Sequence, residues 1–324
     1  MQKIIDNMKT KSRELLDSDV VNAVLAWKQG DLAYDSSPAL FKCSGELDTL
    51  SYDNFCAANL SKYLIAGNDS HFANGSAKTL VFLKPCDTYS LNQLLAEKRI
   101  DRDSVYVIGI GCIGKLDISK LHALGIKGIL KVHDDGENLS INTLYGAEIC
   151  SRKSVLFEKC LSCRGKEHKV FDELLGEELS METADGHRFS GVADIEAKST
   201  DERFVFWRGQ LSKCIRCNAC RDICPACSCY SCVFSNPQSG VSGKVNVTEF
   251  EENLYHIIRA YHVAGRCSDC GECSRVCPQG VPLHLINRKF IKDINSFYGE
   301  FQAGETAELN SPLLHFELDD IEPS

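Results

Sequence analysis

The chain has 324 residues, of which 44% are apolar and 25% are charged, so it can bury an ordinary core in two domains. Its 18 cysteines are therefore not explained as a small secreted disulfide scaffold. A formal net charge of −9 opposes binding to a phosphate backbone and argues against nucleic acid as a partner. The charged start lacks the apolar core of a signal peptide, and no segment approaches the roughly 18–20 apolar residues of a membrane span. We expect a cytoplasmic protein without direct membrane insertion.

The first 60 residues predict a helix at each end. Residues 4–15 mix charges with apolar side chains, and residues 55–64 carry apolar side chains at helical spacing. The sequence between them contains Pro38 and Gly45 and predicts irregular structure.

The sequence after residue 78 predicts repeated βαβ units. Short apolar runs that indicate buried strands alternate with amphipathic segments that indicate helices. The predicted strands are 79–83, 104–110, 127–132 and 151–157. The predicted helices between them are 90–100 and 117–125. Alternation of this kind is typical of an α/β domain with a central parallel sheet.

A domain boundary is expected near residues 195–200. Ser199 and Glu202 have the spacing of a capping box, which predicts a helix that leads into the first cysteine run. A second helix, predicted for 248–265, leads into the next run and ends at Gly265.

Two cysteine runs share the spacing C-x2-C-x2-C-x3-C-P of two-cluster bacterial ferredoxins. In that pattern the first three thiolates of a run bind one [4Fe–4S] cube, and the fourth binds the other cube. The first predicted cluster has the ligands Cys214, Cys217, Cys220 and Cys277. The second predicted cluster has the ligands Cys267, Cys270, Cys273 and Cys224. Neither zinc sites nor disulfides explain both runs and both prolines.

Charged and cysteine residues near the runs leave two alternatives open. The basic residues Lys213, Arg216, Arg221, Arg266 and Arg275 either balance the charge of the clusters, which we favour, or form a docking patch.

Cys227, Cys229 and Cys232 begin an insertion, and their C-x-C-x2-C spacing matches neither run. They either pack the domain as small buried residues or bind metal, by exchange with another cluster or at a further site.

Four more cysteines follow predicted strands of the first domain. They are Cys86, Cys112, Cys160 and Cys163. The carboxyl ends of neighbouring parallel strands face one crevice, so four thiolates can converge there on a third cluster. The pair at 160–163 also fits half of a zinc site or a redox dithiol, and isolated cysteines are often buried as apolar residues.

Residues 109–114, GIGCIG, form a G-x-G-x-x-G run after a strand, with Asp134 and Asp135 about twenty residues beyond, as dinucleotide-binding folds require. In those folds a helix begins inside the glycine run, whereas here it is predicted to begin only at Asp117. Cys112 also occupies the position that approaches the phosphate. We therefore favour the glycines as room for backbone around a cluster.

The segments LKPCD, IGIGC, KCLSC and the two cysteine runs occur in one order that resembles the iron–sulfur β subunits of coenzyme F-420-reducing hydrogenase and formate dehydrogenase. The branch with a C-terminal two-cluster ferredoxin domain, found with heterodisulfide-reductase-like and flavin oxidoreductase modules, is the most similar. The resemblance implies a further [4Fe–4S] cluster on Cys86, Cys112, Cys160 and Cys163. Deazaflavin-using members have a Gly-Gly turn in a flavin-binding segment, and residues 54–80 lack one, which places FAD in doubt.

We therefore predict an α/β domain in 1–197, a mainly helical bacterial-type dicluster ferredoxin domain with an insertion in 198–303, and an acidic tail in 304–324. The favoured function is an electron-transfer subunit of an anaerobic oxidoreductase complex, with other redox subunits or soluble ferredoxin as partners. The alternative is a flavin-containing subunit that takes hydride from a deazaflavin or nicotinamide. We find no catalytic acid–base or nucleophile constellation.

Overall fold

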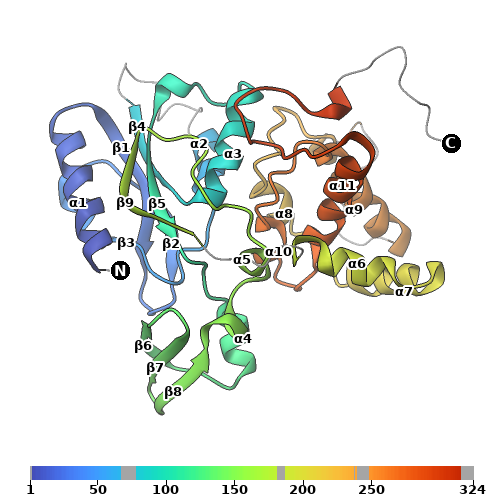
Figure 1. The fold of residues 1–324 in the computed structure, drawn as a ribbon, viewed down its shortest axis with the longest axis horizontal. Helices are drawn as coiled ribbons and strands as arrows, with labels where there is room; N and C mark the ends of the chain where they lie inside the picture. Colours follow the sequence, from blue (N-terminus) through green and yellow to red (C-terminus); the bar gives the residue numbers. More distant parts are fainter. Residues whose placement is uncertain (1, 67–77, 181–186, 237, 239–247, 315–324) are drawn as a thin grey trace. The chain divides into compact units, whose positions relative to one another are not determined.

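The computed structural model describes residues 2–66, 78–180, 187–236, 238 and 248–314 (Figure 1). The chain forms two compact units. Unit 1 comprises Met1–Thr88 and Ile100–Asp185, and unit 2 comprises Tyr89–Arg99 and Gly186–Ser324. Among the described helices, none is long and apolar enough to cross a membrane.

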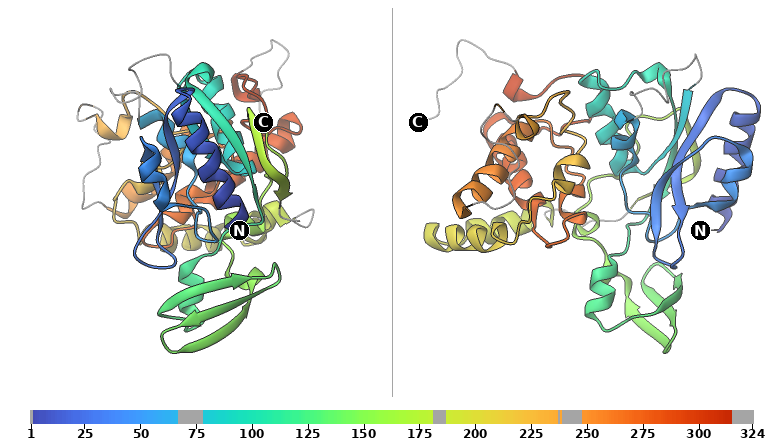
Figure 2. Two further views of the ribbon diagram at one scale, coloured as in Figure 1. Left: turned by 90° about the vertical axis from the view of Figure 1, so that its left-hand side faces the viewer. Right: turned by 180° about the vertical axis from the view of Figure 1, so that it is seen from behind.

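Unit 1 is built on a mixed, mostly parallel sheet in the order β2-β1-β4-β5-β9. These strands are β1 (Val21–Gln29), β2 (Ser36–Phe41), β4 (Lys78–Leu83), β5 (Val105–Cys112) and β9 (Glu173–Ser180). The four from β1 to β9 pair in parallel, while β2 and the short β3 (Leu50–Ser51) pair antiparallel to β1. Helix α1 (Gln2–Asp17) packs against β1 and β9 (Figures 1 and 2). The predicted α/β class is confirmed.

The central strands β4 and β5 are apolar because both of their faces are covered. Leu80, Val81, Phe82 and Leu83 of β4 are fully buried, which leaves no polar alternation in the sequence. The predicted strands at 79–83 and 104–110 are therefore confirmed. The predicted helix between them is α3 (Pro85–Ala96), which begins five residues earlier than expected.

The prediction of a third parallel strand at 127–132 was wrong. That segment forms β6 (Ile129–Asp134), which pairs antiparallel with β7 (Asn138–Thr143), itself antiparallel to β8 (Gly146–Ser151). The connections are hairpin turns, too short for the crossover that parallel pairing needs. Gly136, with φ +99°, supplies the left-handed residue of the first turn. The result is a separate small sheet, set apart from the main one in Figure 2.

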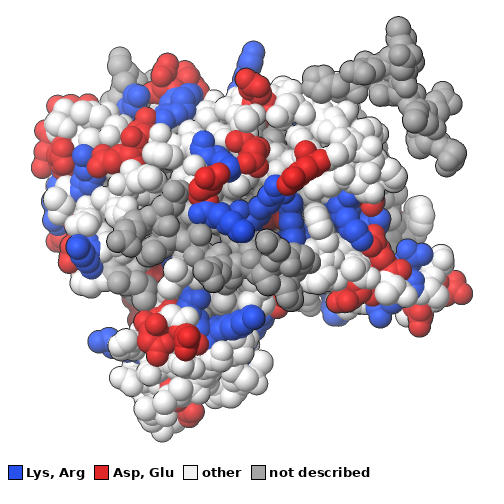
Figure 3. Space-filling view, in the orientation of Figure 1, with Lys and Arg blue, Asp and Glu red and all other residues white. Residues whose placement is uncertain are grey.

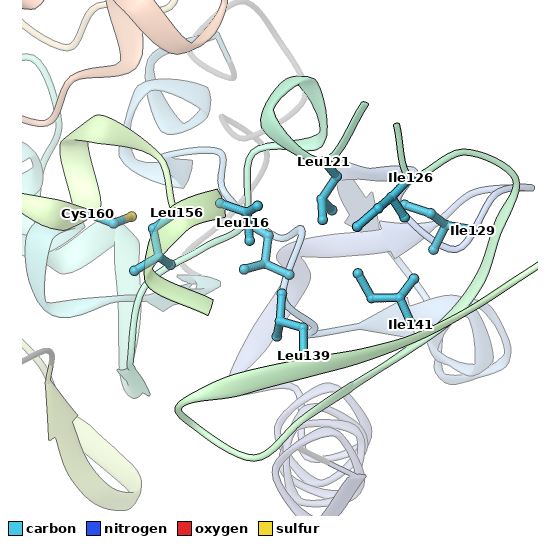
Figure 4. Close-up of a cluster of buried hydrophobic side chains, with 9 residues drawn as sticks. Leu116, Leu121, Ile126, Ile129, Leu139, Ile141, Leu156 and Cys160 are labelled. Carbon is cyan, nitrogen blue, oxygen red and sulfur yellow. The ribbon is translucent and has the colours of Figure 1, made fainter. Parts of the chain in front are cut away.

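The predicted fourth strand at 151–157 was also wrong. Its residues form the 3₁₀ turn Arg152–Val155 and lead into helix α5 (Glu158–Leu161). Val155 and Leu156 pack with Leu116, Leu139 and other apolar residues under the small sheet (Figure 4). The strand that completes the main sheet is β9, an edge strand with a glutamate-rich sequence. An edge strand has a neighbour on one side only and need not be apolar, so its composition did not indicate a strand.

The N-terminal prediction was right for α1 only. Residues 21–41 form β1 and β2 rather than irregular structure. Residues 55–64 form a buried loop that leads into a 3₁₀ turn (Leu60–Lys62) and the short α2 (Tyr63–Ala66), not a full helix. The apolar side chains of this loop, such as Cys56 and Ala57, are buried without helical backbone, so their spacing misled the prediction.

Unit 2 is helical in the part that the structure describes. Its principal helices are α6 (Ser190–Glu196), α7 (Thr200–Leu211), α9 (Glu249–Val263) and α11 (Leu283–Tyr298), with single turns α8 (Ala219–Asp222) and α10 (Glu272–Arg275). The capping box at Ser199 and Glu202 is confirmed, and a second one, at Thr248 and Glu251, begins α9. Helix α9 packs against α7 and α11. Of the predicted tail, residues 315–324 lie outside the described residues.

Candidate iron–sulfur sites

The two cysteine runs have the same backbone conformation. In the first run Arg216 and Asn218 have φ of 53° and 61°, and in the second Asp269 and Gly271 have φ of 57° and 65°. A short helix, α8 or α10, follows each pair of left-handed residues. Left-handed residues tighten the loop, so successive thiols turn toward one centre.

In the first set of predicted ligands, Cys220 has Cys217 and Cys277 as electrostatic neighbours. Cys214 in turn interacts with Cys220. Burial raises the pKa of Cys220, and these two neighbouring thiols raise it further. Cys277 comes from the second run, so the chain crosses over as the ferredoxin pattern requires.

The second set shows the reciprocal crossing. Cys224, from the first run, interacts with Cys267, Cys270 and Cys273. Burial raises the pKa of Cys273 to about 11, and the neighbouring Cys224 adds to that shift. The pKa is raised for Cys267, Cys270 and Cys273, and these thiols ionise readily when iron supplies positive charge.

Hydrogen-bond donors surround both sets. The backbone N–H of Arg216 donates to Cys214 Sγ at 3.4 Å, and that of Val281 donates to Cys277 Sγ at 3.4 Å. The ring nitrogens of His256 and the Nε of Arg259 are buried and have no hydrogen-bond partner among the described residues. Buried donors without a partner fit a site in which cluster sulfides would accept their hydrogen bonds. The residues present thus fit two [4Fe–4S] clusters.

His256 has a second property that bears on this site. One of its ring nitrogens, a Glu252 oxygen and Cys214 Sγ all lie within 4.8 Å of one another. Burial, followed by the nearby Arg259 and Arg216, lowers the pKa of His256 to about 3. The imidazole is therefore neutral at pH 7 and has one N–H to donate.

The four cysteines of unit 1 also come together. Cys86 opens α3 after β4, Cys112 ends β5, and Cys160 and Cys163 lie on and just after α5. The Cys86 and Cys163 thiols are hydrogen-bonded, which raises the pKa of Cys86. Burial raises the pKa of Cys160 to about 12, to which its neighbours Cys112 and Cys163 contribute. Cys160 also lies at one end of the apolar cluster in Figure 4.

Backbone donors and one glycine hold these cysteines. The N–H of Lys115 donates to Cys160 Sγ at 3.3 Å, and the N–H of Gly165 donates to Cys163 Sγ at 3.3 Å. A Cβ on Gly165 would lie 2.4 Å from the backbone nitrogen of Cys86. Only glycine allows this close approach. Sequence reasoning missed Gly165, whose only signal was its place after KCLSC.

Lysines supply positive charge around the same cysteines. Lys84 and Lys115 are 1% and 4% exposed, and both interact electrostatically with Cys112, although Lys84 also forms an ion pair with Asp87 at 2.8 Å. Lys159 lowers the pKa of Cys160 against the effect of burial. Buried cations beside thiols fit a site that holds thiolates. These lysines were also missed, because lysines are common and nothing in their spacing marks them.

The G-x-G-x-x-G run does not have dinucleotide-binding geometry. Strand β5 continues through Gly109 and Gly111 to Cys112, and helix α4 (Ile118–Ala123) begins only after its cap, Asp117. No helix N-terminus therefore meets the glycines, as expected from the sequence.

Comparison with known proteins also indicates two iron–sulfur clusters in the region of the cysteine runs. Residues 210–281 match the 4Fe-4S dicluster domain family. The β subunit of the F420-dependent formate dehydrogenase of Methanocaldococcus jannaschii is 24% identical over 328 residues, which cover 84% of each chain. The β subunit of F420-dependent formate dehydrogenase 1 of Methanococcus maripaludis is 24% identical over 281 residues, 68% of this chain and 71% of that protein.

The chain is similar to the β subunits of F420-dependent formate dehydrogenases and contains a 4Fe-4S dicluster domain. Its dicluster domain implies two [4Fe–4S] clusters and makes it an electron-transfer subunit. Among solved structures, a chain of the F420-reducing [NiFe] hydrogenase complex of Methanosarcina barkeri matches with a TM-score of 0.39 and 12% identity. That match covers 50% of this chain and 62% of the hydrogenase chain, which is less than two thirds of its length.

Three of the six cysteines outside the ligand sets, Cys227, Cys229 and Cys232, follow the first cysteine run. Hydrogen bonding from Cys227 lowers the pKa of Cys224 to about 5. Cys229 is exposed and close enough to Arg266 to interact electrostatically, and Cys232 interacts with Arg221. Cys227 thus interacts directly with a predicted ligand.

The surface charges agree with the acidic composition of the β-subunit-like chain. On the face drawn in Figure 3, acidic and basic side chains are interspersed over the described residues. A nucleic-acid site would need a continuous basic surface, which this face does not present in its described part.

Proposed function

We propose that this β-subunit-like chain is an electron relay in a multi-subunit oxidoreductase. Its two ferredoxin-type clusters would be held by the crossed cysteine sets of unit 2. The first set is Cys214, Cys217, Cys220 and Cys277, and the second is Cys267, Cys270, Cys273 and Cys224. The observation that supports this assignment is the interaction between the runs, of Cys277 with Cys220 and of Cys224 with Cys267. Each cluster accepts and passes on single electrons.

A third [4Fe–4S] cluster on Cys86, Cys112, Cys160 and Cys163 is part of the proposal. Three features support it: the meeting of the four thiols, the backbone N–H groups aimed at sulfur, and the buried lysines. A zinc site would use the same residue types, but it gives no electron-paramagnetic signal and contains no iron. The chain's own residues fix the ligands, exclude water and donate hydrogen bonds that set the potential.

The partners we propose are other redox subunits of the hydrogenase, formate dehydrogenase or heterodisulfide-reductase and flavin oxidoreductase type, or a soluble ferredoxin. The named relatives are β subunits of formate dehydrogenases, which supports a subunit role for this chain. The relay would link a partner's redox centre to a second partner, so no bond to a substrate forms on this chain.

Iron analysis of anaerobically purified protein tests the relay. Three clusters give about twelve irons per chain, and Cys160→Ser with Cys163→Ser should reduce this to about eight while the two ferredoxin signals remain. Cys150→Ser is the matched control, because Cys150 is half-buried in unit 1 and belongs to no predicted set. About eight irons in the unmodified chain would remove the third cluster from the proposal.

A flavin-containing subunit is the second candidate, because both named relatives are F420-dependent enzymes. In this alternative a bound FAD would take a hydride from a deazaflavin, pass its two electrons to the clusters one at a time and release the proton. Part of the segment where the family's flavin turn falls, residues 67–77, lies outside the described residues. Stoichiometric flavin fluorescence after denaturation would favour this candidate over the relay.

A further inference from the structure

The arginines that flank the cysteine runs are already neutralised by carboxylates. Four of the basic residues singled out in the sequence form ion pairs. The pairs are Arg216 with Glu252, Arg221 with Asp222, Arg266 with Glu97, and Arg275 with Glu272. A guanidinium that shares its charge with a carboxylate adds little net positive potential at a neighbouring anion. These residues therefore do not supply the charge balance that the sequence suggested.

Arg259 in the middle of α9 is different. It is 2% exposed, and no described carboxylate pairs with it. Its Nη2 donates to the backbone oxygen of Cys220 at 3.0 Å, while its Nε is buried without a hydrogen-bond partner. A buried guanidinium without a counter-ion is strongly unfavourable, so the folded chain needs an anion beside it.

The anions that surround Arg259 come from both cysteine sets. It interacts with Cys224 and Cys273 of the second set, with Cys220 of the first set, and with Cys227, which belongs to neither set. Cys220, whose backbone oxygen accepts the hydrogen bond from Arg259, packs in one buried cluster with Cys273 of the second set. One fixed cation is thus shared by two groups of predicted ligands.

We propose that Arg259 is the shared counter-charge of the two ferredoxin clusters and raises the reduction potential of both. The inference rests on the ligand sets assigned above and goes beyond the relay function. On reduction a cluster gains one electron, with no bond made or broken and no proton required, so its negative charge increases by one. A nearby fixed cation stabilises the reduced state more than the oxidised state.

Substitution of Arg259 tests this proposal. Arg259→Met keeps a long, flexible apolar side chain and removes the charge. In an anaerobic dithionite titration followed by electron paramagnetic resonance, we expect the reduction equilibrium of both clusters to shift at least tenfold toward the oxidised state. That shift corresponds to about 59 mV lower potential for a one-electron couple. Unchanged potentials, or a shift confined to one cluster, would overturn the proposal.

Arg221→Gln is the matched control. Arg221 lies between Cys220 and Cys224, close to the same ligands, but it pairs with the exposed Asp222. The substitution changes the net charge by the same amount, and we expect less than a twofold shift. An equal shift in this control would mean that burial and the missing counter-ion of Arg259 are irrelevant.

Arg259→Lys separates charge from folding. If Arg259→Met fails to assemble its clusters, the lysine variant should still contain the iron of the unmodified chain and titrate within twofold of it. Loss of iron in both variants would assign Arg259 a structural role instead and overturn the proposal. Loss of iron in ligand variants such as Cys220→Ser tests the cluster assignment separately, so the two failures are distinguishable.

Discussion

Arg266 binds Glu97 through two hydrogen bonds of 2.7 Å, although 168 residues lie between them in the sequence. Glu97 follows α3, whereas Arg266 directly precedes Cys267 of the second cysteine run. The Ser228 hydroxyl also donates to Glu97, at 2.8 Å. Tyr89–Arg99, which include most of α3, thus belong to the same unit as the cysteine runs.

Removing the charge of Glu97 should destabilise unit 2. Glu97→Gln keeps the shape but replaces a bidentate ion pair with a neutral contact, and we expect a loss of about 1–2 kcal/mol, because water partly screens this half-buried pair. Anaerobic thermal unfolding measures the change. Glu46→Gln, on the exposed 3₁₀ turn of unit 1, is a control that should leave the midpoint nearly unchanged.

The stability difference between the unmodified chain and Glu97→Gln should depend on pH. Burial raises the pKa of Glu97, but hydrogen bonds from Arg266, Gln93 and Ser228 outweigh it, so the net pKa lies below the ordinary 4.5. A lowered folded-state pKa gives stability that is fully present above the unfolded-state value and is lost as pH falls through the folded-state value. The difference should be constant from pH 8 to about 5.5 and shrink below about pH 4.5. A difference that grows on acidification would contradict this ion pair.

Gly165→Ala should remove the unit 1 cluster. The added methyl would meet the backbone nitrogen and Cα of Cys86 at 2.4 and 2.8 Å, so Cys163 or Cys86 must move. We expect about four irons fewer, with both ferredoxin signals retained. Gly45→Ala, whose Cβ meets nothing within 4 Å, is the control. Full iron content in Gly165→Ala would mean that the two loops separate without cost to the site.

Asp269→Ala should unfold the loop of the second cysteine run. This carboxylate accepts from Arg188 and Arg288 at 2.9 Å each, and all three side chains are largely buried. Its removal leaves two guanidinium groups without their partner, which costs about 3–5 kcal/mol. Iron content and the unfolding midpoint should both fall. Asp222→Ala, which removes a mostly exposed partner, should change either measurement little.

Thr248→Ala should weaken the start of α9, the helix that carries Arg259. The Thr248 hydroxyl accepts from the N–H of Glu251 in a capping box, and loss of such a cap costs about 1 kcal/mol. Thermal unfolding measures the loss. Ser212→Ala is the comparison, because that hydroxyl only donates to the carbonyl of Gly209 and caps no helix N-terminus. Equal midpoints for the two variants would argue against the capping box.

Local patterns predicted several features well, because each depends on residues that are close in sequence. The capping box at Ser199 depends on a contact three residues away, and the strand at 79–83 depends on a continuous apolar run. The repeated cysteine spacing is accompanied by two loops of the same conformation, in which Arg216 and Asp269 are both left-handed. The wrong predictions concern segments whose structure depends on the strand with which they pair. Residues 129–134 have the composition of a buried strand, yet the following turn directs them into an antiparallel sheet.

By itself, the sequence determined the chemistry of this protein: two cysteine runs with the spacing of a dicluster domain, and the central parallel strands, since cluster ligation and strand burial require specific residue types at specific spacings. Only the tertiary structure decided which positive charges near the cysteine runs have no carboxylate partner. Arg216, Arg221, Arg266 and Arg275 looked like the counter-charges of the clusters, but each has a carboxylate partner. Arg259, which no motif marks, is buried without one among the described residues. Net charge at a site depends on distances between residues far apart in the chain, and only the fold sets those distances.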